Sequence, residues 1–377
     1  MNFNNLEQTG LECLILDKPD ITYYCEYLTM IKPLQLTKHS LSQQNPLVSV
    51  IIGNYNYGCF LAEAIESVLT QTYRHFELIV VDDGSTDNSR EVITSYGEKV
   101  TAIFQHNRGQ GGAFNVGITS SNGDIICFLD ADDYYHPEKL SKIVSGFCNY
   151  PQWVQISHGR FAVDGQGKII GSGSKTHNQG DVSQLLLRWG RYAMAITSAL
   201  AYRRQVLEAV LPIPTTRSEA ADTYLTAVVP FYGEVGCIDE PLMFYRIHGR
   251  NLQARTENIS YLLKQRELNA QYINETATKI GLCDRFDLQR DADYRSFKVI
   301  QQGNSSLRET LQIIWLSWRE SRAIKRNAKD ILERLLRRGL CSLSPSEGKS
   351  VLRLGLRGYF RAKLTHVRQR FKPILTK

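Results

Sequence analysis

The sequence predicts an α/β fold in which a doubly wound, mostly parallel sheet is followed by a helical C-terminal region. Between residues 46 and about 150, short β-branched runs alternate with segments whose apolar residues recur at helical spacing. Strands that alternate with helices imply parallel strands joined by right-handed crossovers within one sheet. From about residue 259 onward, apolar residues at helical spacing on a basic background predict mostly helices.

The first half of the predicted sheet contains four buried strands with helices between them. Apolar and β-branched residues place these strands at 47–52, 76–81, 99–105 and 124–129. Helices are expected at 60–71, near 113–119, and from Pro137, which would occupy the first turn, to residue 150. Residues 153–170 predict two strands joined by an Asp-Gly turn, and helices are predicted at 181–189 and 204–211.

The composition is that of a globular protein, with 42% apolar and 22% charged residues. Eight cysteines without a CxxC pair indicate reduced thiols in a cytosolic protein, and the first residues do not predict a signal peptide. No apolar run approaches the ~18 residues that a membrane-spanning helix needs. We divide the chain into an N-terminal extension (1–45), an α/β domain (46–258) and a basic helical region (259–377).

The net charge of +7 is unevenly distributed along the chain. Residues 308–377 carry 18 Lys and Arg against 5 Asp and Glu, a net +13, which leaves −6 for the rest. Two interpretations of this basic tail stay open. Its helices either lie on an anionic membrane surface or pack on the acidic body, with Trp315 and Trp318 in their core. The protein is accordingly expected in the cytoplasm, free or peripheral on the inner face of the membrane.

Acidic residues follow two of the predicted strands directly. Asp82 and Asp83 stand after the second strand, and Asp130 and Asp132 after the fourth. Ligands of such sheets bind beyond the carboxyl ends of the strands, so these acids are expected to share one cleft. Mg²⁺ or Mn²⁺ prefers carboxylate oxygens, and a site with one or two carboxylates is usually completed by substrate phosphates. The alternative is a surface acidic loop that caps the helix after Pro137.

Three motifs resemble the family 2 glycosyltransferases, over roughly residues 46 to 252. The segment VSVIIGNYNYGCFLAEAIESVLTQTYRHFELIVVDDGSTDNS is similar to the nucleotide-binding half of that family, and NRGQGGAFNVGITSSNGDIICFLDADDYYHPEKL to the half with the Asp-x-Asp. The segment EAADTYLTAVVPFYGEVGCIDEPLMFYRIHGRN resembles its acceptor-side part. The resemblance implies the type A glycosyltransferase fold, a Rossmann-like architecture, and a nucleotide-sugar donor that is commonly a uridine diphosphate sugar.

The resemblance also implies a nucleotide-binding set. Asp83 matches the acid that hydrogen-bonds the base, and Asp82 beside it either shapes that pocket or caps the following helix. Tyr55 lies in the GNYN loop, which matches the turn that passes over the nucleotide. Asp130 sits where the family contacts metal or ribose.

Metal and catalytic roles follow in the same way. Asp132 matches the main metal ligand, Asp130 is a second candidate, and Asp133 is either a further acid of the cluster or a helix cap. His248 matches a position that touches the diphosphate or metal, or pins the segment structurally. Asp222 matches the catalytic base, which would remove the proton of the acceptor hydroxyl. One base without a protein nucleophile implies single displacement with inversion.

The chain also departs from the family pattern. Gly53 and Asn54 replace a common Pro-Thr pair, and Phe114 replaces an arginine that helps to bind the diphosphate, for which Arg108 or the amides of 109–112 would substitute. Ala221 stands where an acid usually precedes the catalytic aspartate, so Glu219 is the alternative base.

Other classes of protein fit the sequence less well. A phosphatase of the haloacid dehalogenase type needs Thr or Val where Tyr134 stands. Two alternatives stay open, a non-catalytic nucleotide-sugar-binding relative and a metal-dependent nucleotidyltransferase. The expected partners are a nucleotide-sugar donor and a saccharide or lipid-linked acceptor from polysaccharide, cell-envelope or glycolipid synthesis. No nucleic-acid recognition module is visible.

Overall fold

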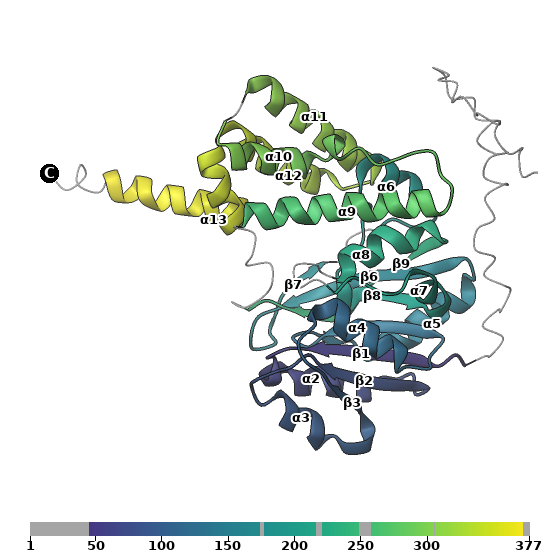
Figure 1. The fold of residues 1–377 in the computed structure, drawn as a ribbon. Coiled ribbons are helices and arrows are strands. Elements are labelled where there is room, and N and C mark those ends of the chain that lie inside the picture. The colour runs from purple at the N-terminus through teal and green to yellow at the C-terminus, as the bar shows by residue number, and fades with distance from the viewer. Residues whose placement is uncertain (1–44, 174–176, 216–220, 249–257, 305, 372–377) are drawn as a thin grey trace, which may run out of the picture. The chain divides into compact units, whose positions relative to one another are not determined.

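A computed structural model describes residues 45–173, 177–215, 221–248, 258–304 and 306–371 of the 377-residue chain (Figure 1). The predicted N-terminal extension, apart from residue 45, lies outside the described residues. The strands belong to one sheet with the order β3-β2-β1-β4-β8-β6-β9-β5, and β7 pairs with β6. Their bounds are β1 Val48–Asn54, β2 Phe76–Asp82, β3 Thr101–Phe104, β4 Ile125–Asp130, β5 Tyr134–Tyr135, β6 Trp153–Val163, β7 Ile169–Gly173, β8 Leu200–Arg203 and β9 Glu234–Arg246.

The parallel half of the sheet confirms the predicted alternation of strands and helices. Strands β1, β2, β3 and β4 pair in parallel, as the alternation required. Their register brings Asn54 opposite Asp82 and Gly53 opposite Asp130, so the carboxyl ends of β1, β2 and β4 are level. This alignment places the acids that follow β2 and β4 at one edge of the sheet.

Helices cover both faces of this sheet. One core cluster joins α2 (Gly58–Leu69) and α5 (Lys139–Asn149) to one face. The opposite face packs on α4 (Gly109–Thr119), α6 (Ser183–Trp189), α7 (Arg204–Val210) and α8 (Ala221–Val228). The short helix α3 (Ser89–Ser95) follows β2. Because the strands are covered on both sides, their apolar runs are continuous rather than alternating.

Helix α4 begins at Gly109, four residues earlier than the apolar periodicity predicts. Its glycines allow close packing that side chains would prevent. A Cβ atom on Gly111 would lie 2.2 Å from the carbonyl oxygen of Pro214, and one on Gly117 would lie 2.4 Å from Ile51. Helix α5 begins at Lys139, so Pro137 precedes its first turn rather than occupying it.

The second half of the sheet is mixed. Residues 153–170 form β6 and the beginning of β7, as predicted, but β5, β8 and β9 were not predicted. Strand β9 is 13 residues long, and its pairing with β6 shifts register near His158, Gly159 and Pro241. A strand that contains a proline and irregular register lacks the simple period of two that sequence patterns detect.

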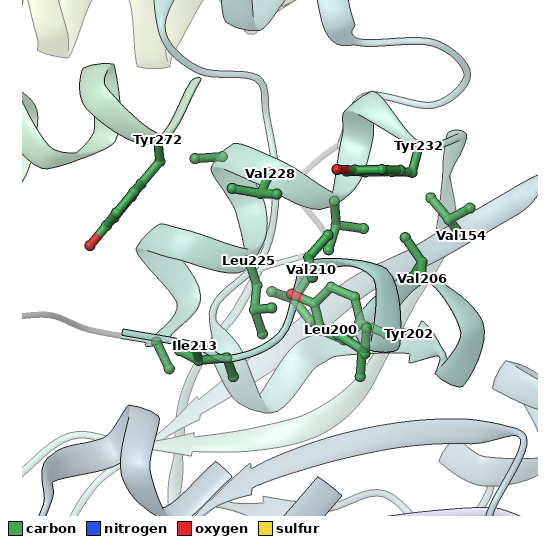
Figure 2. Packing of buried hydrophobic residues seen from close by; sticks show 14 of the residues in the cluster. Val154, Leu200, Tyr202, Val206, Val210, Ile213, Leu225, Val228, Tyr232 and Tyr272 are labelled. Atoms are coloured by element: carbon green, nitrogen blue, oxygen red, sulfur yellow. The ribbon is translucent and has the colours of Figure 1, made fainter. Parts of the chain in front are cut away.

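Five helices form most of the C-terminal region, as predicted. They are α9 (Ile259–Lys279), α10 (Ala292–Gln302), α11 (Leu307–Ala323), α12 (Ala328–Leu343) and α13 (Pro345–Phe371). Within the described segments, no helix is long and apolar enough to cross a bilayer. Helix α9 shares a core cluster with the sheet, and the rings of Tyr224 in α8 and Tyr272 in α9 meet edge to face at 5.0 Å. Figure 2 shows Tyr272 together with Leu225 and Val228 of α8 in this cluster.

A buried ionic network ties the later helices together. Arg338 of α12 donates to Asp293 at 2.8 Å and to Glu320 of α11 at 3.0 Å. Arg191, which follows α6, pairs with Asp293 at 2.7 Å and with Asp291 at 3.1 Å. Burial by itself would raise the pKa of Asp293. The nearby guanidinium groups of Arg338 and Arg191 nevertheless hold this pKa well below its usual range. Removing one partner would leave an uncompensated buried charge.

We predict that Ile273→Ala lowers the free energy of unfolding by about 2–5 kcal/mol, because Ile273 of α9 is fully buried in the core cluster that α9 shares with α8 and the sheet. Urea denaturation measures the change. The matched control is Lys264→Ala on the exposed side of α9, for which we expect a change within about 0.5 kcal/mol. A separate transition for 259–377 that alone responds to Ile273→Ala would contradict shared packing of α9 with the sheet.

Candidate active site

The turn after β2 is held by Asp82. Its carboxylate accepts hydrogen bonds from the side-chain amide of Asn54 at 2.8 Å and from the hydroxyl and backbone amide of Ser85. Asp82 therefore joins the ends of β1 and β2, while α3 begins only at Ser89. The interpretation of Asp82 as a cap of that helix is wrong, because its bonds go to Asn54 and Ser85, which precede the helix.

Asp83 holds the loop that leads into α4. Its carboxylate is buried and accepts hydrogen bonds from the backbone amides of Arg108 and Gly109, both at 2.8 Å, and from the side chain of Gln105 at 2.7 Å. The amide of Gly109 is thus engaged with Asp83. The groups still available to bind the diphosphate in place of the missing arginine are therefore the later amides of 109–112 and the exposed side chain of Arg108.

The loop after β1 carries Tyr55, whose side chain is half exposed. The next residue, Asn56, has a positive φ of 58°, and its side chain accepts a hydrogen bond from the backbone amide of Thr86 at 2.7 Å. Asn54 fills a role that a threonine would not reproduce, since its amide bridges Asp82 and Ser85. The departure from the family pattern at this position therefore has a local structural reason.

Gln110 links Asp130 to the backbone of α8 at Ala221, the residue before Asp222. The side-chain amide of Gln110 donates to Asp130 at 2.9 Å, and its oxygen accepts from the backbone amide of Ala221 at 3.1 Å. Burial, together with the charges of Asp132 and Asp222, raises the pKa of Asp130 to about 7. Three elements, α4, β4 and α8, thus meet at one group of carboxylates.

Asp132, a neighbour of Asp130, is in contact with His248. The Nε2 atom of His248 is 3.0 Å from Oδ2 of Asp132, and both side chains are largely buried. The imidazole ring also packs against Tyr57 and Phe60, with ring centroids 5.7 Å and 5.0 Å away. The histidine therefore has a fixed position beside the predicted metal ligand.

Asp133 supports the turn rather than capping a helix. It is buried and accepts hydrogen bonds from the hydroxyl of Ser198 at 2.7 Å and from the backbone amide of Arg246 at 3.1 Å. Burial, together with the charges of Asp132 and Asp130, raises the pKa of Asp133. Helix α5 begins six residues later, so the interpretation of Asp133 as its cap is wrong.

Asp222 lies in the first turn of α8. The hydroxyl of Thr197 donates to its carboxylate at 3.3 Å, and burial raises the pKa of the carboxyl group. Ala221 is buried and has no side-chain carboxylate. It contributes through its backbone amide, which donates a hydrogen bond to the side chain of Gln110. The alternative base, Glu219, lies outside the described residues.

Gln110, Ser198 and Arg246 were missed by sequence reasoning. Gln110 lies within the glycine-rich loop, whose position before a helix was the available signal. Ser198 connects two parts of the acidic group, because it accepts from the amide of Asp130 at 3.1 Å while donating to Asp133. Arg246 donates to the carbonyl oxygen of Asp132 at 3.1 Å and pairs with Glu63. Ser198 lies outside the three motifs, whereas Arg246 stands in the third motif, two residues before His248, without a spacing signal of its own.

The residues present fit a hard divalent cation. Asp130 and Asp132 supply carboxylate oxygens, and burial together with the neighbouring charges of Asp132 and Asp222 raises the pKa of Asp130, which a bound cation would counteract. Within the described ranges, no group of three or more His, Cys, Asp or Glu side chains is placed to hold a metal ion. A site with two carboxylates agrees with the usual Mg²⁺ arrangement, in which substrate phosphates complete the coordination.

The sheet and the acids at its strand ends are those of a glycosyltransferase. The chain belongs to glycosyl transferase family 2, whose family model matches residues 49–211. An uncharacterized glycosyltransferase of Nostoc sp. is 40% identical over 289 residues, covering 72% of this chain and 88% of that protein. This match confirms the family on which the sequence predictions rest.

Shorter matches concentrate on part of the chain. An uncharacterized glycosyltransferase of Rickettsia prowazekii is 38% identical over 130 residues, 32% of this chain and 41% of that protein. Among solved structures, TarS 1–349 of S. aureus has a TM-score of 0.46 at 18% identity and covers 84% of this chain and 91% of that one. At this TM-score the structural likeness carries no argument about substrate.

We predict that Asp83→Ala lowers the free energy of unfolding by about 1–3 kcal/mol, because the amides of Arg108 and Gly109 lose their acceptor. It should also weaken the binding of uridine or guanosine diphosphate, measured by titration calorimetry. Asp287→Ala, at an exposed acid in the C-terminal region, is the control and should leave nucleotide affinity unchanged. Undiminished affinity in Asp83→Ala would remove this residue from the nucleotide site.

Proposed function

We propose that this enzyme transfers a sugar from a nucleotide-diphosphate sugar to a hydroxyl group of an acceptor, with inversion at the anomeric carbon. The observation that carries the proposal is that Gln110 ties Asp130 to the backbone amide of Ala221, next to Asp222, while Asp132 contacts His248. This arrangement supports a single site in which the proposed metal-binding carboxylates and the proposed base come from distant parts of the chain. Uridine diphosphate sugars are the proposed donors, since the family resemblance favours them.

The nucleotide half of the site is proposed at the carboxyl ends of β1 and β2. Asp83 and Tyr55 are the residues that we assign to nucleotide binding there, and Asp82 holds the turn after β2 against the end of β1. A base contact by Asp83 would use acceptor capacity that its three internal bonds leave over, since a carboxylate offers about four lone-pair sites. The diphosphate would then extend toward Asp130 and Asp132.

Asp130 and Asp132 are the proposed ligands of Mg²⁺ or Mn²⁺, with His248 as a further ligand or as the group that orients Asp132. When bound, such an ion supplies positive charge that offsets the negative charge developing on the leaving diphosphate. The bond of Gln110 to Asp130 and the contact of His248 with Asp132 hold the two carboxylates in fixed positions. A fixed site of this kind loses little energy to reorganisation during the reaction.

Asp222 is the proposed general base. It would accept the proton of the acceptor hydroxyl as the oxygen attacks the sugar, which is the only proton transfer that the single displacement needs. Its position in the first turn of α8, its bond from Thr197 and its burial keep the carboxylate in one orientation. A carboxyl group with a raised pKa is a stronger base than an exposed aspartate.

The acceptor is proposed to be a saccharide or a lipid-linked saccharide, and the pathway polysaccharide, cell-envelope or glycolipid synthesis in the cytoplasm. A screen of uridine and guanosine diphosphate sugars for release of the nucleotide, with Mn²⁺ and Mg²⁺, tests the donor class first. Diphosphate release from none of these donors with either metal would favour the non-catalytic relative. Pyrophosphate release from a nucleoside triphosphate would favour the nucleotidyltransferase.

We predict that Asp132→Ala abolishes metal-dependent release of the nucleotide while the protein stays folded. The physical reason is the loss of a carboxylate that would hold the ion against the diphosphate. Activity is measured over a titration of Mn²⁺, and thermal unfolding checks the fold. Asp181→Ala, which removes an exposed acid at the start of α6, is the control and should retain activity. Full wild-type activity in excess chelator would disprove metal dependence.

We predict that Asp222→Asn reduces turnover by at least about two orders of magnitude with little change in donor affinity, because it keeps the shape and removes the proton acceptor. Single-turnover kinetics measures the chemical step, and calorimetry measures donor binding. Asp222→Glu keeps a carboxylate and should recover part of the lost rate. Near-normal turnover in Asp222→Asn would move the role of base to Glu219 or another group.

A further inference from the structure

Helix α11 is apolar on two opposite faces. One face packs into the protein, where Ile313 and Leu316 join a core cluster with Trp189, and where Glu320 binds Arg338. This buried face fixes the rotation of the helix about its own axis. The side chains on the opposite face of α11 therefore point away from the core of the protein.

The outward face carries a stripe of large apolar side chains. Leu307, Leu311, Trp315 and Trp318 are exposed by 69%, 57%, 52% and 48%, at spacings of four, four and three residues. Such spacing places them along one side of a helix. The interpretation that Trp315 and Trp318 form the core of the C-terminal region is therefore wrong. A contiguous exposed apolar surface with tryptophans is typical of an interaction site rather than of a solvated face.

Three arginines lie at the tryptophan end of the stripe. Arg188, Arg319 and Arg322 line a shallow hollow of about 430 Å³ beside Trp189 and Trp318. The guanidinium group of Arg322 lies 5.9 Å from the ring centre of Trp318, and that of Arg188 lies 5.7 Å from that of Trp189. In the part of the chain that the structure describes, no carboxylate is within the 4.0 Å ion-pair distance of these three groups.

We propose that this face of α11 docks on the surface of an anionic lipid bilayer. Leucine and tryptophan side chains of an interfacial helix enter the boundary between headgroups and acyl chains. Arginine binds phosphate through paired N–H donors and is only weakly hydrated, which suits the headgroup layer. Arg188, Arg319 and Arg322 with the exposed Arg308 at the other end provide cations along the whole stripe.

Charge favours a lipid surface over a second copy of this chain. A twofold interface would place the same face of α11 on both sides and bring these arginines against one another. The exposed residues of α11 include no acid, since Glu309 pairs with Arg295 and Glu320 is buried. An anionic bilayer supplies the opposite charge over the whole stripe.

The test is sedimentation of the full-length protein with vesicles, without any sugar nucleotide, so that it does not depend on the proposed reaction. Vesicles of phosphatidylcholine alone are compared with vesicles that also contain phosphatidylglycerol, at low and at high salt. We expect binding to the anionic vesicles at low salt and its loss at high salt, because salt screens the attraction. Arg319→Gln with Arg322→Gln should weaken binding on the order of fivefold per arginine.

Two matched controls separate this face from charge or hydrophobicity in general. Trp315→Ala with Trp318→Ala should release the protein from anionic vesicles, whereas Leu332→Ala with Leu336→Ala, at exposed positions of α12, should not. Lys99→Gln with Lys264→Gln removes the same charge as the arginine pair from other exposed sites and should preserve binding. Thermal unfolding shows that each variant is folded.

Three outcomes would overturn the proposal. The first is wild-type protein that stays in the supernatant with anionic vesicles at low salt. The second is that the α11 variants and the control variants lose vesicle binding to the same extent, or that the α11 variants keep it. The third is a dimer in solution, measured by light scattering, that the tryptophan variant dissociates while vesicle binding is unchanged, which would make the stripe a contact between copies of this chain.

Discussion

The level ending of three parallel strands is the constraint on which the site depends. Because Asn54 lies opposite Asp82 and Gly53 opposite Asp130, the chain leaves β1, β2 and β4 at the same height. A shift of one residue in either pairing would also turn the side chains to the other face of the sheet. The buried apolar side chains on both faces prevent such a shift, so the core and the position of the acids are set together.

Hydrogen bonds then convert neighbouring strand ends into a connected site. Gln110 joins β4 to α8, Ser198 joins Asp130 to Asp133, and Arg246 reaches back from the end of β9 to the turn after β4. These bonds are largely shielded from water, where an unpaired polar group is costly. Breaking one of these bonds would disturb the positions of the nearby acids, so α4, α8 and β9 all support the proposed site.

The C-terminal region divides its basic residues between two tasks. Arg338 is buried and holds α10, α11 and α12 together through Asp293 and Glu320. Arg319 and Arg322 remain without such partners in the described residues and lie against tryptophan rings at the surface. A net charge of +13 is thus not one uniform property of the tail. Part of it is neutralised inside, and part is presented to the outside.

The sequence by itself determined the parallel half of the sheet, the helical C-terminal region and the acids after β2 and β4, because strong local periodicity and adjacent strand ends need no distant information. Only the tertiary structure decided the beginning of α4 at Gly109, strand β9, the bridging role of Gln110 and the exposure of Trp315. Glycine has no side chain to reveal a helix, and a helix apolar on two faces does not indicate which face is covered. Those features depend on contacts between residues far apart in the chain.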